Sequence, residues 1–135
     1  MADSTLLYTA VYDSMDDARA DLDAFEAVHD ADYLGKYDAA VVDKKNGKPH
    51  IAKRVDRPRI EIIPEFFGAG NLPRKELKAA ADELNASNVA LIVVGEPTLE
   101  KGLEQTITRA ARTAKHDVDV ATDTLADELI AAVRD

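Results

Sequence analysis

The sequence contains no cysteine, so a disulfide framework and thiol catalysis are both excluded, and a reducing cytoplasm is compatible with the composition. It also lacks any apolar run near the roughly 18 residues of a membrane span. The first residues, Met1 to Ser4, have neither the positive region nor the apolar core of a signal peptide. We therefore expect a soluble, cytoplasmic protein with no transmembrane segment.

Positive charge is scarce: 17 Lys and Arg stand against 26 Asp and Glu, which gives a net charge of −9. Such an acidic surface argues against nonspecific nucleic-acid binding. The charge is unevenly distributed. Residues 13–32 hold eight acids and one arginine, whereas residues 44–59 hold seven Lys or Arg and one acid. We expect a surface divided by charge. The acidic, alanine-rich composition suits a bacterial protein.

Apolar periodicity places five strands along the chain. The run Val89–Val94 is apolar throughout, which is typical of a strand buried on both faces. Asn46-Gly47 predicts a type I′ hairpin turn, because both positions accept positive φ. The remaining strands are predicted at residues 5–12, 37–43, 50–55 and 117–122. Amphipathic helices are predicted from Ser14, from Pro73, from Pro97 to about Ala114, and from Asp123.

Two strand–helix–strand halves repeat in this pattern, and such halves can interlock about a pseudo-twofold axis. The prediction is one α+β domain over residues 1–135, a ferredoxin-like plait with about five mainly antiparallel strands in the order 5-1-4-2-3 and helices on one face. The alternative is a sheet in simple sequence order with the last strand outside. Residues 56–72 form an irregular apolar connector, since Pro58 and Pro64 exclude a central strand or a helix interior.

Three segments carry a family resemblance: Tyr37–Val42 leading into the lysine-rich Asn-Gly hairpin, Ala90–Val94, and Glu96-Pro97-Thr98 at the start of a helix. Together they resemble a bacterial family of unknown function whose members are often labelled predicted membrane proteins. In that family a long Gly/Ala-rich apolar hairpin follows the third strand. This chain has only Arg59 to Gly70 there, so the membrane label does not carry over. The family assigns no catalytic residues.

The basic hairpin is the first candidate for a binding surface. An acidic protein partner, a phosphate-bearing ligand or the acidic helix of a second copy would all suit its charge. The alternative is a solvated edge that resists aggregation. Nucleic acid is disfavoured, because no aromatic residue is interleaved with these cations to stack on bases, and the first aromatic residue after the hairpin is Phe66. The candidate partner-binding residues are Lys44, Lys45, Lys48, Lys53, Arg54, Arg57 and Arg59.

The apolar connector is the second candidate. Exposed in a monomer, it would form a patch that soluble proteins avoid, so it suits an oligomer contact or the lip of a ligand cavity. The alternative is packing on the sheet face left open by the helices. Plait sheets commonly bury such an open face by dimerising, so we favour a homodimer that uses this segment. Peripheral contact with an anionic membrane is a further hypothesis. The residues concerned are Ile60, Ile62, Ile63, Phe66 and Phe67.

Other chemical motifs are weak. His29, His50 and His116 lack the spacing of a zinc site, and no serine stands in a nucleophile elbow. The sequence predicts no catalytic residue, metal or cofactor. We favour a non-enzymatic module for binding or self-association. The alternative from another class is a small-ligand or cofactor-binding enzyme with its pocket between the sheet and the apolar connector.

Overall fold

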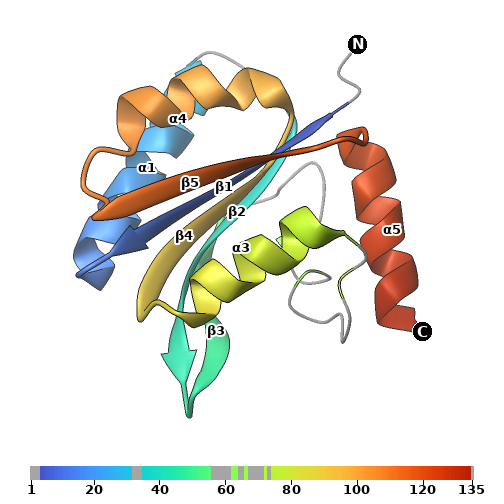
Figure 1. Cartoon of the computed structure of the whole chain (residues 1–135). Helices are drawn as coiled ribbons and strands as arrows, with labels where there is room; N and C mark the ends of the chain where they lie inside the picture. The colour runs from blue at the N-terminus through green and yellow to red at the C-terminus, as the bar shows by residue number, and fades with distance from the viewer. Residues whose placement is uncertain are drawn as a thin grey trace.

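The computed structural model describes residues 4–31, 35–55, 62, 63, 66, 72 and 74–134, which form one five-stranded antiparallel sheet with helices on both faces (Figure 1). The lateral order is β3-β2-β4-β1-β5, which is the predicted order 5-1-4-2-3 read from the other edge. The strands are β1 (Thr5–Tyr12), β2 (Tyr37–Lys45), β3 (Lys48–Arg54), β4 (Val89–Gly95) and β5 (Arg112–Val118).

Strand β4 occupies the middle of the sheet, where its continuous apolar run predicted it. It pairs antiparallel with β1 on one side and β2 on the other. Ala90, Ile92 and Val94 point into one apolar cluster, while Leu91 and Val93 point into a second cluster on the opposite face. Both faces of β4 are therefore buried, which explains why the strand has no polar alternation.

The turn between β2 and β3 has the predicted conformation. Asn46 has a φ of 56° and Gly47 a φ of 76°, so both central positions lie in the left-handed region that a type I′ turn requires. Among the described strands, β3 pairs only with β2 and forms one edge of the sheet. A register shift between Val41 and Val42 interrupts this pairing and blunts the edge.

Two helices cover the first face of the sheet. These are α1 (Met15–Ala31) and α4 (Glu100–Thr106), which follows the 3₁₀ turn η1 (Pro97–Leu99). Helix α1 starts as expected, because the Ser14 hydroxyl accepts a hydrogen bond from the Asp17 amide at 3.1 Å. Leu22 and Phe25 from α1 and Leu103 from α4 are buried against this face.

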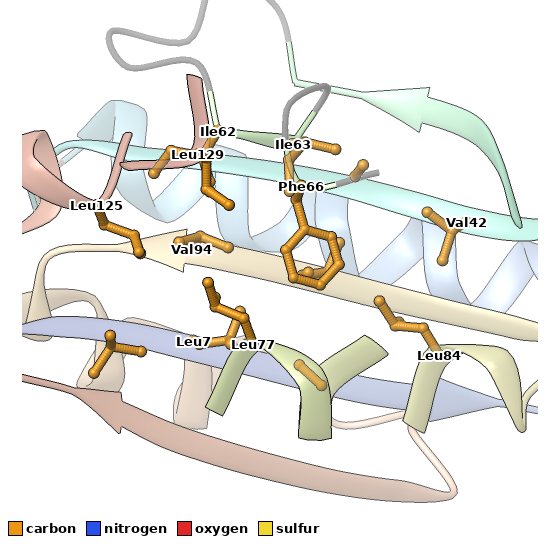
Figure 2. Close-up of a cluster of buried hydrophobic side chains, with 14 of the residues drawn as sticks. Leu7, Val42, Ile62, Ile63, Phe66, Leu77, Leu84, Val94, Leu125 and Leu129 are labelled. Carbon is orange, nitrogen blue, oxygen red and sulfur yellow. The ribbon is translucent and has the colours of Figure 1, made fainter. Parts of the chain in front are cut away.

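The second face is covered as well, by α3 (Lys75–Asn85) and α5 (Thr122–Arg134) (Figure 1). Leu77 and Leu84 from α3 pack with Leu125 and Leu129 from α5 over Leu7 and its neighbours (Figure 2). The helices were predicted on one face of the sheet, whereas α1 and α4 cover one face and α3 and α5 cover the other. The premise that one sheet face stays open was wrong, because the apolar stripes of α3 and α5 also need a surface on which to pack.

The boundaries near the C-terminus also differ from the prediction. The helix expected to reach Ala114 ends at Thr106, and the strand expected at residues 117–122 lies at Arg112–Val118. Gly102, Thr106 and Ile107 favour a helix only weakly. Pairing of β5 with β1, from Val11↔Arg112 to Thr5↔Val118, then fixes the strand earlier in the chain.

The Glu96-Pro97-Thr98 segment has a structural role at the end of β4. The Glu96 amide donates a hydrogen bond to the Lys36 carbonyl oxygen at 3.0 Å, and the Lys36 amide donates to Glu96 Oε1 at 2.6 Å. These reciprocal bonds hold the end of β4 against the start of β2. The backbones approach so closely that a Cβ on Gly95 would lie 2.3 Å from the Lys36 oxygen.

Candidate functional site

The basic hairpin divides into an internally neutralised base and an exposed tip. At the base, Arg54 donates to both carboxylate oxygens of Asp38, at 3.1 Å from Nε and 2.7 Å from Nη2. Next to it, Lys53 forms an ion pair with Asp23 on α1. Two of the predicted partner-binding cations therefore hold β3 to the rest of the domain.

Asp38 does more than neutralise Arg54. Its carboxylate is fully buried, and Oδ2 accepts hydrogen bonds from the backbone amides of Ile62 and Ile63, each at 2.9 Å. A carboxylate that receives an arginine fork and two backbone N–H groups is satisfied without water. Asp38 thereby ties the apolar connector to β2.

The tip presents three lysines to solvent. Lys44, Lys45 and Lys48 are exposed and make no ion pair with any residue that the structure describes. Lys45 and Lys48 are direct register partners across the hairpin. Like charges directly opposite each other in a sheet are unfavourable. In Figure 1 the β2–β3 turn extends past the helices, so a partner can reach this charge.

The remaining members of the basic set lie elsewhere. Arg57 and Arg59 are outside the described residues, so the structure does not place them relative to the tip. His50, which the sequence did not assign to the hairpin's binding set, is 2.8 Å from Asp43 through Nδ1. The candidate surface is thus the hairpin tip, defined here as Lys44, Lys45 and Lys48.

The described residues of the apolar connector do not form the contact surface that the sequence suggested. Ile62 and Ile63 are fully buried and Phe66 is 3% exposed. All three point into the cluster between the sheet, α3 and α5 (Figure 2). This is the alternative in which the segment packs on its own sheet. These three side chains have almost no surface left for a second copy or a membrane. Ile60 and Phe67 lie outside the described residues.

Tyr12, Tyr37 and the buried acid Asp21 also have structural roles. Asp21 is fully buried and accepts bonds from the Tyr12 hydroxyl at 2.8 Å and from Arg109, through its amide at 3.0 Å and Nη1 at 2.9 Å. Burial, together with this carboxylate, raises the pKa of Tyr12. Burial likewise raises the pKa of Tyr37, whose ring centroid is 4.6 Å from that of His29.

One constellation was not foreseen from the sequence. Glu83 on α3 accepts a hydrogen bond from the Thr9 hydroxyl at 2.5 Å, and its other oxygen is 3.1 Å from His116 Nε2. The residues come from three elements far apart in the chain. The only sequence signal was a polar Thr9 within the apolar strand β1. Among the described residues, no group of three or more His, Cys, Asp or Glu is arranged to hold a metal ion.

The described part of the chain has no helix with the length and apolar character needed to cross a membrane. No protein-family model matches the chain, and comparisons with curated proteins and with solved structures find no match either, so the functional argument rests on geometry and charge.

Proposed function

We propose that the protein is a binding module that docks on an acidic protein surface through the hairpin tip. The observation that carries this proposal is the contrast within one hairpin: Lys53 and Arg54 are paired internally, whereas Lys44, Lys45 and Lys48 have no anionic partner among the described residues. An acidic partner relieves the like-charge contact between Lys45 and Lys48, so part of the binding free energy comes from removing an existing repulsion.

Charge supports an acidic protein segment over other anions. The net charge of −9 repels a polyanion over most of the surface, so a long nucleic acid would gain contacts only at the tip. The exposed tip residues include no aromatic side chain for base stacking. A carboxylate-bearing loop or helix of limited size can reach three lysines without approaching the acidic faces.

Self-association is the competing use of the same charge, because α1 carries exposed acids such as Asp16 and Asp30. The reason given by the sequence for a homodimer, an open sheet face, is weakened, since α3 and α5 cover that face. We therefore place the acidic surface on a different protein. A second copy is an outcome that the test below would reveal.

Fluorescence anisotropy with a labelled decaglutamate peptide tests the proposal at low ionic strength. We expect saturable binding that weakens strongly with salt, because the Debye length falls to about 10 Å at 0.1 M. Replacing Lys44, Lys45 and Lys48 with Gln removes three exposed charge pairs, each worth about 0.2–1 kcal/mol. Binding should fall by roughly 3- to 150-fold.

The matched control replaces Lys75, Lys78 and Lys101 with Gln, which makes the same charge change at exposed helical positions. Equal loss of binding in the two triple variants would refute a specific hairpin site. Tighter binding of an oligonucleotide than of decaglutamate would contradict the protein partner. A salt-sensitive dimer in sedimentation velocity, abolished by the tip variant, would instead identify a second copy as the occupant.

A further inference from the structure

A shallow hollow lies between α3 and the β5 edge of the sheet, away from the hairpin. Its volume is about 110 Å³, and it is lined by Thr9, Val11, Glu83, Arg112, Thr113 and Ala114. The register pairs Thr9 with Ala114 and Val11 with Arg112, so these four side chains rise from the same face of the sheet. The small Ala114 leaves the space that a larger side chain would fill.

One end of the hollow carries a fixed carboxylate. Each oxygen of Glu83 already has one partner, Thr9 at 2.5 Å and His116 at 3.1 Å, which holds the group in place over β1. A carboxylate has about four acceptor positions, so Glu83 can accept further hydrogen bonds from a bound donor. Its side chain is 32% exposed and can be reached from solvent.

The other end carries a cation. Arg112 is exposed and makes no ion pair with any residue in the described part of the chain. Thr9 and Val11 are two residues apart on one strand, which separates the two ends by roughly 7 Å along the sheet. Between them, Val11 and Ala114 supply a short apolar floor.

We infer that this hollow binds a short amino acid whose ammonium and carboxylate groups are separated by several carbon atoms. The ammonium donates to Glu83, the carboxylate accepts from Arg112, and the carbon chain lies over Val11 and Ala114. A volume of about 110 Å³ exceeds the roughly 10–15 Å³ of a single water site and is below the roughly 300 Å³ of a drug-sized pocket. The inference adds a ligand site to the proposed binding function and does not depend on the hairpin.

Titrating the ¹⁵N-labelled protein with three probes of equal chain length tests the site: γ-aminobutyrate, butyrate and butylammonium. Each probe is added to about 20 mM, roughly twenty times a 1 mM Kd, and ¹H–¹⁵N correlation spectra record the amide shifts. We expect saturable shifts at the amides of Thr9, Val11 and Ala114. Because each charged hydrogen bond contributes strongly, γ-aminobutyrate should bind at least about tenfold more tightly than either single-charge analogue.

Arg112→Gln should weaken γ-aminobutyrate binding at least about tenfold and leave butylammonium binding unchanged. Glu83→Gln should have the complementary effect, weakening butylammonium and sparing butyrate. Lys101→Gln, on α4 and the opposite face, should change neither. The inference is overturned if no probe gives saturable shifts, if butyrate binds as tightly as γ-aminobutyrate, or if Arg112→Gln has no effect. Because Arg112 is exposed, that variant keeps the fold intact for the measurement.

Discussion

Replacing the buried Asp38 with Ala should be among the most destabilising single changes in this chain. The carboxylate receives two hydrogen bonds from Arg54 and one each from the Ile62 and Ile63 amides. The change removes every acceptor at once. Arg54 is 25% exposed and can turn to water, but the two amides have no such alternative while the connector stays in place.

The expected loss follows from those partners. Leaving a buried donor unsatisfied costs about 1–3 kcal/mol, and removing one member of a buried ion pair costs about 3–5 kcal/mol. These figures overlap because they describe the same contacts, so we expect a total loss of about 3–5 kcal/mol. Asp38→Asn keeps one acceptor oxygen but turns an amide N–H₂ toward Arg54. It should cost about 2–3 kcal/mol.

Urea unfolding at pH 7 measures this loss as a fall in the midpoint, with the slope checked for two-state behaviour. Asp43→Asn is the control, because its pair with His50 is partly exposed and should be worth less than about 1 kcal/mol. Hydrogen exchange gives a local readout at the amides of Ile62 and Ile63, which should lose protection in both Asp38 variants. A loss below about 1 kcal/mol for Asp38→Ala, or retained protection, would refute the reasoning.

Three further predictions concern packing and ionisation. Gly95→Ala should lower stability by about 1–3 kcal/mol or more in thermal unfolding, because the added Cβ would lie 2.3 Å from the Lys36 oxygen. Phe66→Ala should cost about 3–5 kcal/mol without changing the oligomeric state measured by sedimentation, since the ring is buried within the chain. Because the pKa values of Tyr12 and Tyr37 are raised in the folded state, their contribution to stability is fully present below about pH 10 and is lost as the pH rises above it. The part of the tyrosinate absorbance at 295 nm that comes from these two of the four tyrosines should therefore appear only with alkaline unfolding.

Each of these has a control and a contrary outcome. Gly47→Ala adds a Cβ with no atom within 4 Å, so any cost there comes from its φ of +76° alone, and a larger loss than for Gly95→Ala would contradict the steric argument. Ile130→Ala, at a 36% exposed position, should cost less than Phe66→Ala. Ionisation of Tyr12 and Tyr37 in the folded protein at pH 10 would show that they are not buried as described.

Much of the sheet was predictable because local and global preferences agree. The apolar run of β4 requires cover on both sides, and only a central position provides it. Asn46-Gly47 has few favourable conformations other than the observed turn. The C-terminal boundaries were not predictable in this way, because residues 117–122 alternate as a strand would, while pairing with β1 selects Arg112–Val118 instead.

The candidate sites were also only partly predictable, because they depend on contacts between residues far apart in the chain. The sequence identified the basic hairpin, but only the folded chain shows that Asp23 and Asp38 neutralise the cations at its base. The lysines of the hairpin tip have no such partner among the described residues. The hollow beside β5 depends on Glu83, which is 74 residues from Thr9 and 33 from His116. No local pattern brings these residues together; tertiary packing of α3 over β1 and β5 does.

The central claim, an acidic partner docked on the hairpin tip, is tested most directly by titrating the ¹⁵N-labelled protein with decaglutamate at low salt and following every backbone amide. We predict saturable shifts confined to residues 43–50, which disappear when Lys44, Lys45 and Lys48 are replaced with Gln. Shifts centred on other residues, or a spectrum that does not change at saturating peptide, would contradict the account.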